Sequence, residues 1–167
     1  ALFTVVYFFI LFIILPKQFV LKEIIIATVF TLGIFLIPVM GIRGEVFTQE
    51  LLLLWSQIFL LALANALIFS WYEYESDKQY NEPSIAQILG RRAVHIIIIL
   101  LLILFLITLF VSFTLSVDWV QIITLEIMGS ILFISLVFSK YFYDNGAYRF
   151  IVESIFIIPL ISLLIEI

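Results

Sequence analysis

Two carboxylates spaced four residues apart, Glu73 and Asp77, are the side chains of this sequence that best suggest a chemical site. On a helix that continues past Trp71 they lie one turn apart on one face, whereas Glu75 points elsewhere. Carboxylates at this spacing suit a hard cation such as Mg²⁺, which binds through one or two carboxylates, keeps water ligands and bridges to substrate phosphates. The spacing therefore predicts that Glu73 and Asp77 bind Mg²⁺.

Basic residues close to these carboxylates extend the predicted site. Lys78 follows them directly, and Arg91 and Arg92 come after the polar segment 76–90. Guanidinium groups bind phosphate oxygens through paired hydrogen bonds. We therefore expect Lys78, Arg91 and Arg92, with Lys22 as a further candidate, to bind the diphosphate of a lipid-linked substrate. The alternative is a solvated loop whose mixed charges pair only loosely.

The composition of the chain assigns it to the membrane proteins. Hydrophobic residues make up 65% of the 167 residues, whereas soluble domains contain about 45–50% apolar residues. Long uncharged runs such as 96–110 do not alternate with polar residues as the strands of a membrane barrel do. Cysteine is absent, which excludes disulfides and thiol chemistry. The sequence therefore predicts an all-α integral membrane protein, with no soluble domain and no nucleic-acid partner.

Six apolar runs predict six transmembrane helices in one domain over 1–167. A spanning helix needs about 20 mostly apolar residues, and every run except the first is close to that length. Because the first run is short and begins with Ala1, we expect it to be the end of a helix in a longer protein. Pro159 should kink the last helix. The predicted spans cover approximately 1–16, 22–40, 50–72, 92–116, 119–139 and 149–166.

The distribution of basic residues predicts the orientation of these spans. Cytoplasmic loops of membrane proteins carry an excess of Lys and Arg. If the spans alternate, one side receives only Arg43, and the segment that contains Glu73 and Asp77 lies on the other side. We therefore expect this acidic segment to face the cytoplasm, in a bacterial inner membrane. The basic residues on that side are Lys17, Lys22, Lys78, Arg91, Arg92, Lys140 and Arg149.

Two segments, 65–77 (NALIFSWYEYESD) and 84–92 (SIAQILGRR), resemble the second signature of the UbiA-type intramembrane prenyltransferases. That family has an acidic D-x-x-x-D motif at the end of its sixth helix and a Leu-Gly pair before its seventh. The segment 17–33 is similar to the region that leads into the fifth helix. The six predicted spans then resemble helices four to nine of a nine-helix bundle. Glu73 stands where the family has Asp, and the family's first acidic motif is not in this chain.

The resemblance implies a Mg²⁺-dependent enzyme that transfers an isoprenoid chain from a prenyl diphosphate to a hydrophobic aromatic or lipid acceptor. In this chain, Glu73 and Asp77 would bind the metal ions. We expect the helices that carry the first motif to precede Ala1 in the full protein. The alternative is a catalytically inactive, UbiA-like subunit that supports partner proteins in a membrane complex.

Other polar residues have simpler interpretations. His95 is expected to be hydrogen-bonded at the membrane interface, and Gln57 and Asn65 are expected to join helices by hydrogen bonds rather than to line a cavity. Glu126 falls inside a predicted span, where carboxylates are candidates for function. A proton relay and an interhelical hydrogen bond explain Glu126 equally well, and a transporter or channel that uses Glu126 is a third functional class. Glu153 is expected to cap or snorkel.

Overall fold

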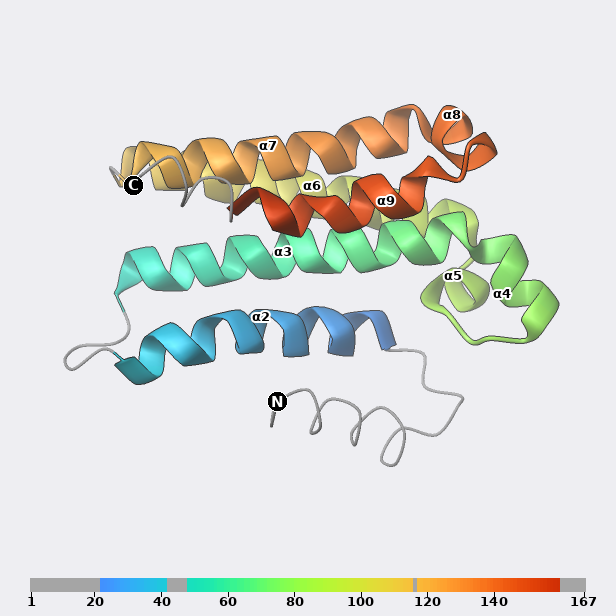
Figure 1. Cartoon of the computed structure of the whole chain (residues 1–167), viewed down its shortest axis with the longest axis horizontal. Helices are drawn as coiled ribbons and strands as arrows, with labels where there is room; N and C mark the ends of the chain where they lie inside the picture. Colours follow the sequence, from blue (N-terminus) through green and yellow to red (C-terminus); the bar gives the residue numbers. More distant parts are fainter. Residues whose placement is uncertain (1–21, 42–47, 116, 160–167) are drawn as a thin grey trace.

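The structure is a computed structural model that describes residues 22–41, 48–115 and 117–159, and within these ranges it is built from helices (Figure 1). The prediction of an all-α protein is therefore confirmed for this part of the chain. Among the described residues, four helices are long and four are short. The long helices are α2 (Lys22–Gly41), α3 (Gln49–Tyr72), α6 (Arg91–Thr114) and α7 (Trp119–Val137), and the short ones are α4 (Tyr74–Tyr80), α5 (Ile85–Leu89), α8 (Ser139–Asp144) and α9 (Ala147–Ser154).

Helix α3 is the centre of the bundle. It packs most extensively against α6 and α2, and it also contacts α7 and α9. Its buried residues include Leu61, Ala64 and Ile68, spaced at three or four residues so that they share one face. The helix begins at a Thr48 cap, whose hydroxyl accepts the Leu51 N–H at 3.2 Å. Most elements of the fold are thus positioned by one central helix.

Three helices, α3, α6 and α7, are long and apolar enough to cross a membrane. They coincide with the predicted spans 50–72, 92–116 and 119–139 within a few residues. Helix α6 turns large apolar side chains outward, among them Leu100 (59% exposed) and Phe110 (69% exposed). A continuous apolar surface of this kind is typical of contact with lipid. The three helices indicate a membrane protein.

The other predicted spans are described only in part. The predicted span 22–40 is the helix α2, whereas 1–16 and the end of 149–166 lie outside the described residues. In the last predicted span, α9 changes to a 3₁₀ turn at Ile155–Ile157, just before Pro159. A proline ring clashes with the carbonyl four residues earlier, which here belongs to Ile155. This agrees with the irregularity predicted at Pro159.

The polar segment is more regular than the sequence suggests, because most of it is helical. Helix α3 ends at Tyr72, and α4 follows after the single residue Glu73. Asn81, with a left-handed φ of 55°, ends α4, and Gly90, with a φ of 84°, separates α5 from α6. Helices α4, α5 and α8 gather at one end of the bundle, where α3 ends and α6 begins (Figure 1). We call this the polar end.

Candidate functional site

A cavity of about 390 Å³ lies beside α2 and α3 and extends to the polar end. We call it the α2–α3 cavity. Its charged lining residues are at the start of α2 and at the junction of α3 with α4, whereas Phe30, Phe69 and Phe156 form an aromatic part of the wall. A site that combines charged groups with an apolar wall suits an amphipathic ligand. The polar residues that line the cavity are Lys22, Glu23, Asn65, Ser70, Glu73 and Asp77.

Both predicted metal ligands line this cavity. The Asp77 N–H donates to the Glu73 carbonyl at 2.8 Å, which places the two residues one helical turn apart. Asp77 is buried, at 8% exposed, and its carboxylate has no hydrogen-bond partner among the described residues. Glu75 is exposed. The expectation that Glu73 and Asp77 share a face while Glu75 points elsewhere agrees with this geometry, and their role as metal ligands stays a prediction.

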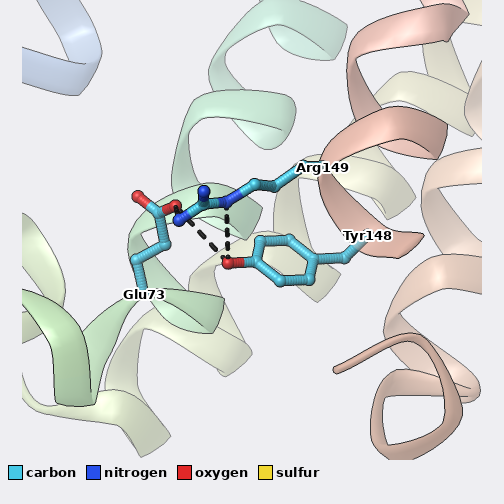
Figure 2. Close-up of polar contacts among 3 residues, drawn as sticks. All are labelled: Glu73, Tyr148 and Arg149. Atoms are coloured by element: carbon cyan, nitrogen blue, oxygen red, sulfur yellow. Dashed lines mark hydrogen bonds and ion pairs between the residues drawn. The ribbon is translucent and has the colours of Figure 1, made fainter. Parts of the chain in front are cut away.

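Glu73 has partners that the sequence did not reveal. Arg149 of α9 forms an ion pair with it, with 2.7 Å between Nη2 and Oε1 (Figure 2). The Tyr148 hydroxyl donates to the same oxygen at 3.4 Å and accepts from Arg149 Nε at 3.2 Å. The only signal in the sequence was that Arg149 falls on the predicted cytoplasmic side. Arg149 and Tyr148 therefore orient the Glu73 carboxylate and partly neutralise it.

Tyr148, which contacts Glu73, belongs to a cluster of stacked tyrosines. The Tyr148 ring stacks on Tyr72 with 4.5 Å between centroids, and Tyr143 stacks on both rings at 6.4 Å. The Tyr72 hydroxyl donates to the Ser135 carbonyl of α7. Tyr72 and Tyr148 are buried, whereas Tyr143 is 47% exposed. They join the end of α3 to α7 and α9.

Glu23 lies in the wall of the cavity and also holds α5. It is only 2% exposed, and its Oε1 accepts the Ile85 N–H at 3.0 Å. The next amide of α5, Ala86 N–H, donates to Ser70 Oγ at 3.2 Å. Glu23 Oε2 is buried and has no hydrogen-bond partner in the described part of the chain, and the same is true of Asn65 Oδ1. Two residues of the cavity wall, Glu23 and Asn65, thus each have one buried oxygen without a donor among the described residues.

The predicted diphosphate-binding residues lie elsewhere. Lys78 is exposed on α4, and neither it nor Arg91 and Arg92 are among the residues that line the α2–α3 cavity. Arg91 stacks over the Trp71 ring, with 4.2 Å from its guanidinium carbon to the ring centroid. The cationic residue that does line the cavity is Lys22. A role for Lys78, Arg91 or Arg92 toward a diphosphate stays a prediction.

The cavity offers oxygen donors that fit Mg²⁺. Mg²⁺ commonly uses one or two carboxylates and takes its remaining ligands from water and phosphate, and Glu73 and Asp77 are two carboxylates that line one cavity. Across residues 22–41, 48–115 and 117–159, no group of three or more His, Cys, Asp or Glu side chains is placed to hold a metal. The protein part of such a site would therefore need phosphate oxygens to complete it.

The remaining polar residues differ in their surroundings. Gln57 Nε2 donates to Ser112 Oγ at 2.7 Å, so the predicted interhelical hydrogen bond is confirmed. For Asn65 that expectation was wrong, because Asn65 lines the cavity. The His95 ring lies 5.6 Å from the Trp71 ring, between centroids. Glu126 is exposed on α7, in a separate hollow beside Phe105 and Gly129, and Glu153 is exposed on α9.

Comparison of the chain with protein-family models, curated protein sequences and solved structures finds no match. The resemblance to UbiA-type prenyltransferases therefore rests on the motif-like residues of the chain itself.

Proposed function

We propose that this protein is a membrane prenyltransferase, which transfers an isoprenoid chain from a prenyl diphosphate to a hydrophobic acceptor with the help of Mg²⁺. The observation that carries the proposal is the position of Glu73 and Asp77 on one cavity with an aromatic wall. The proposal includes six membrane spans, in the order of helices four to nine of a UbiA-type bundle. The polar end would face the cytoplasm, which keeps the charged diphosphate of the substrate outside the apolar part of the membrane.

Each part of the cavity has a task in this proposal. Glu73 and Asp77 would hold Mg²⁺, which when bound supplies electrostatic stabilisation of the leaving diphosphate. Arg149 and Tyr148 hold the Glu73 carboxylate in the metal-free protein, and Arg149 would release it when Mg²⁺ binds. Lys22 neutralises phosphate charge, and the aromatic wall binds the isoprenoid chain and excludes water from the reaction.

The proposal is tested by binding of farnesyl thiodiphosphate, a slowly reacting prenyl diphosphate analogue, to the purified protein with and without Mg²⁺. Asp77→Asn should weaken Mg²⁺-dependent binding at least about tenfold, which corresponds to ~1.4 kcal/mol, because a charged ligand is replaced by a neutral amide. Glu75→Gln is the matched control, because Glu75 is acidic, two residues away and exposed. Unchanged binding in Asp77→Asn would refute the metal role.

A second candidate function is that of a catalytically inactive membrane subunit in a larger complex. The observation that favours it is the ion pair of Glu73 with Arg149, which occupies an oxygen that a metal ion would need. This candidate predicts stable copurification with partner proteins and no Mg²⁺-dependent binding of the analogue. The same titration therefore distinguishes the two functions.

A further inference from the structure

A second hollow at the polar end has a different chemistry from the α2–α3 cavity. It measures about 520 Å³ and is lined by Trp71 at the end of α3 and by Arg91, Arg92, His95 and Ile96 at the start of α6. It contains two guanidinium groups and no carboxylate. We call it the basic hollow. The basic hollow is separate from the α2–α3 cavity, on which the proposed enzymatic function is built, because Arg91 and Arg92 do not line that cavity.

The two arginines of the basic hollow have no anionic partner within the described ranges. Among the described residues, the ion pair that forms joins Glu73 and Arg149. The first turn of α6 contains no acidic residue. Both arginines are exposed. Cations at a helix N-terminus are unfavourable, because the macrodipole is positive at that end. An anion bound in the hollow would relieve this repulsion.

The surroundings of the hollow indicate where the anion comes from. After Ile96, α6 continues with Leu100 and Ile103 exposed on its surface. Helix α6 is one of the three helices of the described residues that are long and apolar enough to cross a membrane. The basic hollow therefore adjoins the exposed apolar face of the same helix. The Trp71 ring holds Arg91 at 4.2 Å by a cation–π contact, and tryptophan favours the headgroup level of a bilayer. Both parts of a phospholipid find a matching surface here.

We propose that the basic hollow binds the phosphate of an anionic phospholipid, whose acyl chains lie along the outward face of α6. Arg91 and Arg92 contact the headgroup, and Trp71 holds Arg91 in place. Basic pockets between transmembrane helices on the cytoplasmic side bind anionic headgroups. The site is independent of prenyl transfer, and it predicts selectivity for anionic over zwitterionic lipid.

The test measures lipid binding close to Trp71. The sequence has three tryptophans, so Trp55→Phe and Trp119→Phe together leave Trp71 as the only indole. The protein is placed in nanodiscs of phosphatidylcholine with a small fraction of phosphatidylglycerol brominated on its acyl chains, which quenches nearby indoles. We expect half-maximal quenching at an about tenfold lower fraction of brominated phosphatidylglycerol than of brominated phosphatidylcholine, equal to ~1.4 kcal/mol.

Substitutions then locate the site. Arg91→Gln combined with Arg92→Gln should abolish the preference for phosphatidylglycerol, whereas Lys78→Gln combined with Lys140→Gln should retain it. The control removes the same charge from exposed positions at the polar end. Equal quenching by both lipids in the arginine-containing protein, or an equal loss of preference in both double variants, would overturn the proposal.

Inorganic phosphate distinguishes a lipid site from a site for free phosphate. A lipid site predicts that millimolar phosphate leaves the quenching by phosphatidylglycerol unchanged when sodium sulfate is used to match ionic strength. Displacement by phosphate but not by sulfate would overturn the assignment to lipid and indicate a soluble phosphate ligand. Neither result depends on Mg²⁺ or on a prenyl diphosphate, so the lipid site and the proposed enzyme function stand or fall separately.

Discussion

Helices α3 and α6 have the same length, 24 residues each, but they serve the protein in different ways. In the most apolar stretch of α3, 39% of the residues are buried, against 22% in α6. Helix α3 carries polar side chains along its length, including Gln57, Asn65 and Ser70, whereas α6 is almost entirely apolar after His95. In this bundle, therefore, the less hydrophobic helix is the more central one. Polar residues mark the helix that the others surround.

Truncation of one leucine in each helix should give the largest difference in stability between α3 and α6. Leu61 of α3 is fully buried, and Leu100 of α6 is 59% exposed. Leu61→Ala should lower the free energy of unfolding by about 2–5 kcal/mol, because it leaves a cavity. Leu100→Ala should change it by about 0.5 kcal/mol or less, because lipid replaces the lost contacts. Unfolding in mixed detergent micelles measures both, and similar losses would contradict the central position of α3.

At the polar end, the charged residues of the two helices also have different partners. A substitution of Arg149 tests this difference. Glu73 at the end of α3 is ion-paired with Arg149, whereas Arg91 at the start of α6 stacks on an indole. Arg149→Gln should strengthen Mg²⁺ binding to the α2–α3 cavity about fivefold, because an exposed ion pair contributes up to ~1 kcal/mol. Calorimetric titration with Mg²⁺ measures the change. Lys140→Gln is the control, and weaker binding in Arg149→Gln would show that Arg149 serves the site in another way.

A small effect is expected where α3 and α6 meet. Gln57 and Ser112 form the hydrogen bond that joins them. Gln57→Leu should destabilise the protein by about 0.6 kcal/mol, the average for interhelical hydrogen bonds in membranes. It also removes Gln57 Oε1, a buried atom without a partner in the described residues, which offsets part of the loss. Unfolding of Ser112→Ala gives an independent value, and a loss as large as that of Leu61→Ala would be unexpected.

Much of the architecture follows from local patterns that any reader of the sequence can find. The positions of α3, α6 and α7 follow from runs of apolar residues, because lipid accepts little else. The common face of Glu73 and Asp77 follows from helical spacing. Both are properties of short segments, so they need no knowledge of the rest of the fold.

The candidate site was less predictable, because it depends on which helices become neighbours. The partner of Glu73 is 76 residues away, at Arg149, and seven basic residues shared the predicted side of the membrane. Asn65 and Gln57 are both amides on α3, yet one lines a cavity and the other joins α6. Their difference comes from which neighbouring helix lies opposite each of them, which composition does not encode.

The capping of α5 has a consequence for how the protein can be observed. A helix of five residues is not stable alone, and its first two amides are held by Glu23 of α2 and Ser70 of α3. Hydrogen exchange at Ile85 and Ala86 therefore reports whether α2 and α3 are docked. If α2 separates from α3, the Ile85 amide loses its acceptor and should exchange before the amides inside the long helices do. Helix α5 thus serves as a natural probe for the opening of the cavity.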